Sequence, residues 1–154
     1  MATHKATVNW TANGADTASR RYSRAHQWAF DGGAVVPASS SPHVVPKPWS
    51  DEQAVDPEEA LVAAAASCHM LSFLFVAAKA GLSVESYEDA AEGTLGKNEA
   101  GRFAMTRIVL RPRIAFRGKQ PDAAQLQHMH HQAHDECFIA SSLKTEIVVE
   151  PPEN

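Results

Sequence analysis

Two cysteines, Cys68 and Cys137, are the side chains of this sequence with the greatest capacity for covalent chemistry. Taken singly, a buried cysteine is more often a small hydrophobe than a reactive group. Taken together, the two thiols suit an attacking cysteine and a second cysteine that resolves it, provided that they lie close together. An attacking thiolate needs a cation nearby, and Arg24 is the most attractive candidate. Their separation of 69 residues leaves the proximity of the two thiols open.

Histidines offer a rival chemistry. Four of the eight cluster at residues 128–134, just before Cys137, and two of these, His130 and His134, are spaced i, i+4, which places two imidazoles on one helix face as a metal site would. No fixed zinc signature accompanies these histidines. We therefore expect the thiol chemistry to need no metal or other cofactor. A metal-binding protein that uses histidines and Cys137 is the alternative. His69 follows Cys68 directly but points about 100° away around a helix, so adjacency does not make it the base of that cysteine.

Composition narrows the classes of function. The chain has 154 residues, enough for one self-sufficient core, and we expect a single domain over residues 1–154. Its 18 acidic residues exceed its 14 basic ones, so the sequence offers no basic surface for nucleic acid. The first residues lack the basic start and apolar run of a signal peptide, which predicts a cytoplasmic protein. Two cysteines are also too few for a disulfide scaffold.

A long apolar helix is the element that must position Cys68. Asp56-Pro57-Glu58-Glu59 is typical of a helix start, and Gly81 predicts its end, about 36 Å away. The segment 60–78 contains no Asp, Glu, Lys or Arg and is long enough to cross a membrane, but its alanines and His69 favour a buried helix of a soluble protein. One chain offers little to cover such a helix on every side. We therefore predict a homodimer with paired central helices.

The other elements follow from alternation and turn residues. Tyr22, Arg24, His26, Trp28 and Phe30 alternate, so one strand is predicted to carry all five on one face. In chain order we predict strands at 6–10, 22–30 and 34–36, a functional or mobile loop at 37–56, the long helix, a hairpin of strands 84–95 and 102–116 with a bulge or edge at Pro112, a helix from Pro121 to about Phe138, and a strand at 143–149. Neighbouring strands joined as hairpins predict an antiparallel α+β fold.

Two segments carry a family resemblance. Asp56 to Cys68, DPEEALVAAAASC, and His134 to Ser142, HDECFIASS, resemble the OsmC/Ohr family of peroxide-reducing thiol proteins, and the agreement extends over essentially the whole chain. The resemblance implies an α+β fold whose antiparallel sheets wrap around long central helices in an intertwined homodimer. It implies that Cys68 is the peroxidatic cysteine and Cys137 the resolving one. Glu58 falls on the glutamate of the family, and Arg24 is the best match to its arginine. The motif Ser67-Cys68-His69-Met70 resembles that of a less characterised branch of the family.

The activity implied by the resemblance is antioxidant reduction of hydroperoxides, regenerated by an external dithiol. His26, His69, Phe75 and His134 are the candidates for substrate binding, and apolar walls would favour organic hydroperoxides. Glu58 and Cys68 are ten residues apart, about 15 Å on a straight helix. Contact between them requires either a break in the helix or a partner subunit that supplies Glu58 and Arg24 to the site. We expect an ion pair between Glu58 and Arg24 that holds the guanidinium beside the thiolate. A non-catalytic binder of small molecules on the same fold is a further alternative.

Overall fold

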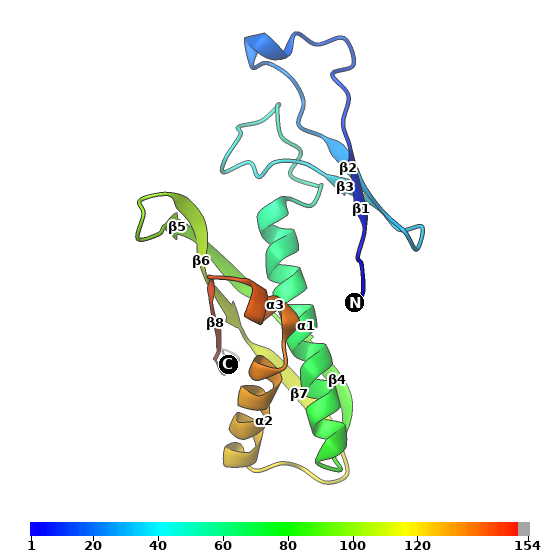
Figure 1. Cartoon of the computed structure of the whole chain (residues 1–154), viewed down its shortest axis with the longest axis vertical. Coiled ribbons are helices and arrows are strands. Elements are labelled where there is room, and N and C mark those ends of the chain that lie inside the picture. The colour runs from blue at the N-terminus through cyan, green and yellow to red at the C-terminus, as the bar shows by residue number, and fades with distance from the viewer. Residues whose placement is uncertain (151–154) are drawn as a thin grey trace. The chain divides into compact units, whose positions relative to one another are not determined.

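The computed structural model describes residues 1–150 (Figure 1). The elements in chain order are β1 (Ala6–Asn9), the 3₁₀ turn η1 (Thr17–Ser19), β2 (His26–Phe30), β3 (Val35–Ala38), α1 (Pro57–Lys79), β4 (Ser83–Asp89), β5 (Glu92–Lys97), β6 (Phe103–Leu110), β7 (Pro112–Arg117), α2 (Ala123–Asp135), α3 (Phe138–Ser142) and β8 (Glu146–Val149). They divide into two compact units, Met1–Ala60 and the chain from Leu61 onward. A single domain over residues 1–154 stays a prediction.

The first unit is built on an antiparallel sheet in the order β1-β2-β3. β2 begins at His26, so the predicted strand from residue 22 is wrong in its first half. The reason is that the Arg24 amide donates to the carbonyl of Trp49, at 2.9 Å, and not to a neighbouring strand. Tyr22 and Arg24 therefore lie in an irregular segment that leads into the sheet.

The segment predicted as a loop, 37–56, is tied down at both ends. β3 continues through Pro37 to Ala38, which forms a parallel bridge with Val55. The fully buried Ser39 accepts a hydrogen bond from the Asp51 amide at its hydroxyl oxygen, 3.0 Å away. Between these anchors the chain forms only turns, as its prolines predict.

Both predicted ends of the long helix are confirmed to within two residues. Asp56 and Glu59 form a capping box, in which the Glu59 amide donates to Asp56 Oδ1 at 2.8 Å and the Asp56 amide donates to Glu59 Oε2 at 3.1 Å. At the other end Gly81 adopts φ 71°, and the Leu82 amide reaches back to the Ala77 carbonyl at 3.0 Å. This is a Schellman motif, which needs the left-handed backbone that glycine supplies most easily.

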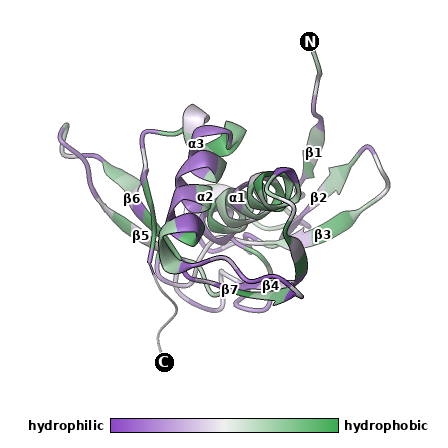
Figure 2. Cartoon of the chain, turned by 90° about the horizontal axis from the view of Figure 1, so that it is seen from below, coloured by the Kyte–Doolittle hydropathy of each residue, from purple (hydrophilic) through white to green (hydrophobic). Residues whose placement is uncertain are grey.

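Helix α1, seen end-on in Figure 2, is mostly apolar around its circumference, yet one chain buries only one side of it. The buried residues are Ala65, His69, Phe73, Val76 and Ala77. Leu71 and Phe75 lie on another face and are 60% and 56% exposed. By length and composition α1 could also cross a membrane, the one such helix among the described residues, but the core helix of a soluble protein has the same properties.

The second unit contains the predicted hairpin, but each long strand breaks in two. β5 pairs with β6 and β4 pairs with β7, both antiparallel and in separate sheets. The break falls at Arg111, whose amide donates to Asp89 Oδ1 at 2.7 Å and not to a strand carbonyl. The next residue, Pro112, has no amide hydrogen to continue the ladder. The bulge or edge predicted at Pro112 is thus a boundary between two sheets.

The end of the chain departs from the prediction in two ways. The predicted helix from Pro121 starts two residues later, after the N-cap Asp122, and divides around Cys137 into α2 and α3. β8 then pairs with β6 in parallel, so that Ile147 lies opposite Ile108. All other strand pairs are antiparallel, and the α+β class with antiparallel sheets and a long helix is confirmed.

Two apolar clusters hold the second unit together. The first joins α1, α2 and the loop that follows α1 through Phe73, Val76, Ala77, Leu82, Met129 and Ala133. The second packs Ala65 of α1 against Ile108 and Leu110 of β6. In this region α1 approaches β5 closely, because a β-carbon on Gly93 would overlap the side chains of Val62 and Met105.

Candidate active site

The side chains of Cys68 and Cys137 interact in the second unit. Cys68, on α1, is partly exposed, whereas Cys137 is 2% exposed, and both are free thiols. Burial raises the pKa of the Cys137 thiol, and a side-chain hydrogen bond with Cys68 raises it further. The fold therefore brings together two cysteines that are 69 residues apart in the sequence.

The sulfur of Cys137 is held by the short helix that follows it. Cys137 is the N-cap of α3, and its Sγ accepts a hydrogen bond from the Ala140 amide at 3.4 Å. That hydrogen bond lowers the pKa of the thiol and so opposes the effect of burial. The Cys137 amide donates to the His134 carbonyl at 3.1 Å, which ties the cysteine to the end of α2. The break between α2 and α3 thus fixes the position of the sulfur.

A histidine pair lies beside Cys68 in the chain but faces the core. The His69 ring is 1% exposed, stacks on His130 with centroids 5.3 Å apart, and shares a hydrogen bond between its Nε2 and His130 Nδ1 at 3.0 Å. Burial and the neighbouring histidines lower the pKa of both rings to about 4, so both are neutral at pH 7. His134 is near enough to contribute to this effect on His69.

The contact between His69 and His130 was not predicted from the sequence. The sequence indicated a shared helix face for His130 and His134, but the stacking of His130 on His69 depends on how α1 and α2 pack. Among residues 1–150, no group of three His, Cys, Asp or Glu side chains is arranged to hold a metal ion. The metal-binding alternative therefore gains no support from the described part of the chain.

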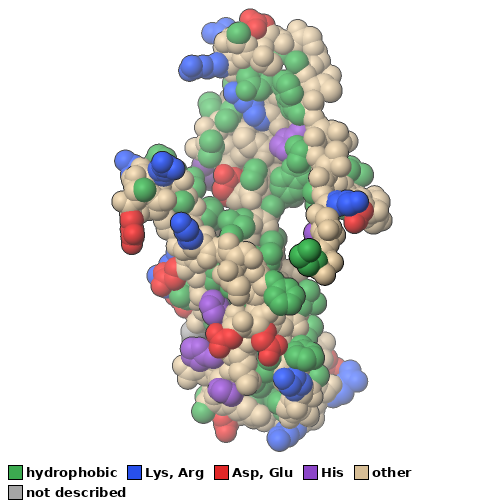
Figure 3. Space-filling model, viewed as in Figure 1, with side chains coloured by type: hydrophobic (Ala, Val, Ile, Leu, Met, Phe, Trp, Pro, Cys, Tyr) green, Lys and Arg blue, Asp and Glu red, His purple; other side chains and the backbone are tan. Residues whose placement is uncertain are grey.

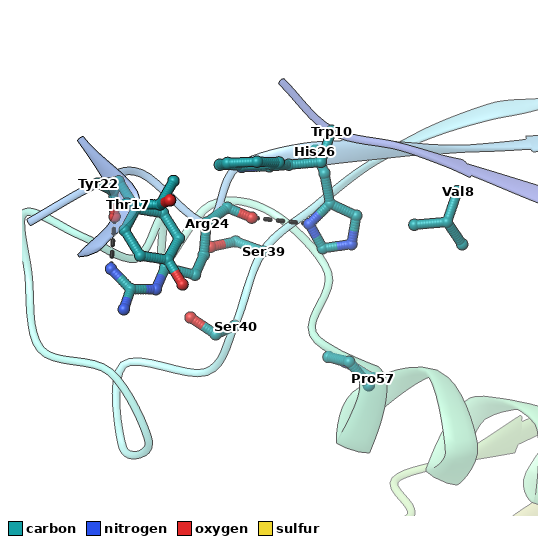
Figure 4. Close-up of a pocket in the computed structure, with 9 residues that line it drawn as sticks. All are labelled: Val8, Trp10, Thr17, Tyr22, Arg24, His26, Ser39, Ser40 and Pro57. Atoms are coloured by element: carbon teal, nitrogen blue, oxygen red, sulfur yellow. Dashed lines mark hydrogen bonds between the residues drawn. The ribbon is translucent and has the colours of Figure 1, made fainter. Parts of the chain in front are cut away.

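Arg24 and His26 lie in the first unit and line a pocket of about 500 Å³ (Figure 4). Arg24 Nη1 donates to the carbonyls of Arg20 and Tyr22, and its guanidinium carbon lies 3.7 Å from the centre of the Tyr22 ring. His26 Nε2 accepts a hydrogen bond from Trp28 Nε1 at 3.0 Å, so its Nδ1 carries the hydrogen that faces the Arg24 carbonyl at 2.7 Å. Hydrogen bonds at both ring nitrogens therefore fix the orientation of the His26 ring.

The predicted ion pair between Arg24 and Glu58 is absent within the described chain, because the guanidinium turns back to backbone carbonyls and the Tyr22 ring. The predicted break in the helix is also absent, since α1 runs unbroken from Pro57 to Lys79. Phe75, a predicted substrate contact, is exposed on α1 and has the Lys79 ammonium 5.2 Å from its ring centre. Figure 3 shows such apolar side chains uncovered at the surface.

Comparison with known proteins identifies relatives of the whole chain. Residues 50–151 match the family model of OsmC-like proteins. The chain is 30% identical over 102 residues to the peroxiredoxin OsmC of Escherichia coli, covering 66% of this chain and 69% of that protein. It is 53% identical to an OsmC-like protein of unknown function from Vibrio cholerae, with a TM-score of 0.95 over 98% of this chain and 99% of that structure. An organic hydroperoxide resistance protein from Elizabethkingia anophelis shares the fold, with a TM-score of 0.70 at 16% identity over 98% and 97% of the two chains.

Proposed function

The chain belongs to the OsmC-like protein family, and from this premise we propose that it reduces organic hydroperoxides with the thiols of Cys68 and Cys137. The observation that carries the proposal is that two free thiols from elements far apart in the chain lie near each other, close enough for Cys68 to raise the pKa of the Cys137 thiol. Relatives named as a peroxiredoxin and as organic hydroperoxide resistance proteins support the choice of substrate.

Cys68 is the attacking residue in this proposal, because it is the more exposed of the two thiols. Its thiolate attacks one peroxide oxygen, the O–O bond breaks, and the leaving alkoxide takes up a proton to become an alcohol. The product on the protein is a Cys68 sulfenic acid. The Cys137 thiol then attacks that sulfur, the S–O bond breaks, water leaves, and a disulfide forms.

Cys137 suits the resolving step for two reasons. Burial and the contact with Cys68 raise its pKa, so it is less ready than a free thiol to ionise and attack peroxide itself. Its sulfur is already held at the start of α3 by the Ala140 amide. An external dithiol then supplies two electrons and two protons through thiol–disulfide exchange and restores both cysteines. Because thiols are kept reduced in the cytoplasm, we propose that the cycle takes place there.

A homodimer is the second part of the proposal. Leu71 and Phe75 leave an apolar face of α1 uncovered in one chain, and a second copy of α1 would cover it. We infer that the partner subunit supplies Glu58 and Arg24 to the thiol site, because α1 is unbroken between Glu58 and Cys68. Contact of the substrate with His26, His69, His134 and Phe75 stays a prediction.

Serine substitutions test the thiol cycle. With tert-butyl hydroperoxide and dithiothreitol, we expect Cys68→Ser to abolish peroxide consumption, since the attacking sulfur is lost. Without dithiothreitol, Cys137→Ser should consume one equivalent to form the Cys68 sulfenic acid and a second to oxidise it to sulfinic acid, which peptide mass spectrometry detects. Ser67→Ala changes an exposed neighbour on α1 and serves as the control. Steady-state turnover that is unchanged in Cys68→Ser would refute the proposal.

A further inference from the structure

The two thiols of the candidate active site are held by two different helices. Cys68 lies on α1, whereas Cys137 follows the C-cap of α2 and donates its amide hydrogen to the His134 carbonyl at 3.1 Å. A shift of α2 along α1 therefore moves the Cys137 sulfur relative to the Cys68 sulfur. A disulfide needs the two sulfurs to meet at about 2.05 Å with a defined torsion angle, so the rate at which it forms depends on how α2 is held.

Apolar side chains make a contact between α1 and α2 that has little directional preference. Phe73 and Val76 of α1 belong to one buried cluster with Met129 and Ala133 of α2. The hydrophobic effect depends on the area removed from water and not on direction. These side chains therefore stabilise the packing of the two helices but specify their register only weakly.

A hydrogen bond between two imidazoles gives this contact a direction. His69 of α1 and His130 of α2 share a hydrogen bond of 3.0 Å between Nε2 and Nδ1, and their rings stack with an interplanar angle of 12°. The His130 ring also packs against the Phe73 ring, with the centroids 4.6 Å apart. Hydrogen bonds weaken steeply when their distance or angle changes, so the histidine pair favours one register of α2 against α1.

The burial of His69 lowers stability, which argues against a purely stabilising role for the pair. His69 is 1% exposed, and its Nδ1 has no hydrogen-bond partner in the described chain. A buried nitrogen without a partner is unfavourable, and two apolar side chains of similar shape would avoid that cost. Buried polar groups that lower stability are best known for specifying one register between helices.

We propose that His69 and His130 are positioning residues for the resolving step, because their hydrogen bond holds α2 where the Cys137 sulfur can reach the Cys68 sulfur. His69 directly follows Cys68, and His130 lies about two helical turns before Cys137. In this step the S–S bond forms, the S–O bond of the Cys68 sulfenic acid breaks, and the hydroxyl leaves as water with the proton of the Cys137 thiol. The inference rests on the proposed thiol cycle and concerns its second reaction.

His130→Phe tests the hydrogen bond while keeping a stacked ring. Without reductant, each variant is treated with a series of tert-butyl hydroperoxide concentrations, and mass spectrometry measures the ratio of Cys68 sulfinic acid to disulfide. The slope of this ratio against peroxide compares oxidation of the sulfenic acid with attack by Cys137. We expect the slope to be at least ten-fold above wild type in His130→Phe, with the first oxidation of Cys68 unchanged. His130→Asn, whose amide can replace Nδ1 in the bond to His69, should stay within three-fold of wild type.

A glutathione redox buffer tests the same inference without peroxide. The equilibrium between the dithiol protein with oxidised glutathione and the disulfide protein with reduced glutathione measures how well the fold presents one thiol to the other. We expect its constant to fall at least ten-fold in His130→Phe, about 30 mV in reduction potential, and to stay near wild type in His130→Asn. His128→Phe, at an exposed position of α2, is the matched control and should match wild type in both assays.

The double variant His69→Phe/His130→Phe separates positioning from stability. Replacing both partners with apolar rings leaves neither imidazole buried without its partner, so urea unfolding should show no loss of stability. The slope and the glutathione equilibrium should nevertheless change as in His130→Phe, a result that a merely stabilising role does not produce. The double variant also remains informative if the single variant does not fold.

Four results would overturn the inference. They are wild-type values in the double variant, an equal change in His128→Phe, an equal change in His130→Asn and His130→Phe, and a wild-type protein that forms no disulfide in the glutathione buffer. Failure of the proposed thiol cycle looks different, because the wild-type protein would then consume no peroxide while the glutathione results still stand.

Discussion

The buried pair His69 and His130 links single side chains to the pH dependence of folding. The folded-state pKa of each ring is about 4, below the ordinary value of 6.5 that an unfolded chain retains. Between these two values the unfolded chain binds protons that the folded chain does not bind. The free energy of unfolding is therefore unaffected above pH 6.5 and falls as the pH decreases toward 4.

Replacing His69 tests this linkage. His69→Gln removes one titrating ring but keeps a hydrogen-bonding side chain next to His130. We expect the loss of stability between pH 6.5 and pH 4 to be smaller in this variant by about 3 kcal/mol. Urea unfolding at several pH values measures the difference. His128→Gln, at an exposed position on α2, should leave the pH dependence unchanged. An equal change in both variants would show that the buried pair is not its source.

At the scale of single residues, the sequence indicates which side chains are reactive but not which of them lie in contact. Cys68 and Cys137 stand out by their chemistry, whereas their interaction depends on the packing of α3 against α1 across 69 residues. Arg24 was assigned to a strand because its neighbours alternate, but the hydrogen bond of its amide to Trp49 is a long-range feature that alternation cannot reveal.

At the scale of elements, the close approach of α1 to β5 depends on the missing side chain of Gly93. A β-carbon there would overlap Val62 of α1 and Met105 of β6. We expect Gly93→Ala to destabilise the fold by about 1–3 kcal/mol, because helix and sheet must move apart or the two side chains must leave their preferred conformations. Thermal or urea unfolding measures the loss. The matched control is Gly32→Ala, where a β-carbon meets nothing within 4 Å, and a loss of equal size there would contradict the packing argument.

Elements defined by local signals were predicted well. The limits of α1 follow from a capping box and a glycine, which act over a few residues. The division of the hairpin at Arg111 was missed because it depends on the Asp89 carboxylate, 22 residues earlier. The parallel pairing of β8 with β6 was missed for the same reason, since strand direction is decided by tertiary packing and not by alternation.

At the scale of the whole molecule, the uncovered face of α1 predicts self-association. Leu71→Glu places a charge on a side chain that is 60% exposed in one chain, so it should barely affect a monomer. If a second α1 covers this face, the buried charge should dissociate the dimer, which sedimentation equilibrium measures. Gln127→Glu introduces the same charge on the exposed surface of α2 and should leave the mass unchanged. A wild-type protein that sediments as a monomer contradicts the proposal.

The parallel strand β8 has a consequence for folding during translation. Ile147 and Val149 of β8 complete the cluster around Ile108 and Leu110, but they are synthesised only after the segment 111–145. Until then one edge of β6 has no partner and can pair with the edge of another nascent chain. Interrupted translation before Glu146 would thus leave an aggregation-prone fragment, and rapid completion of the last strand protects the newly made chain.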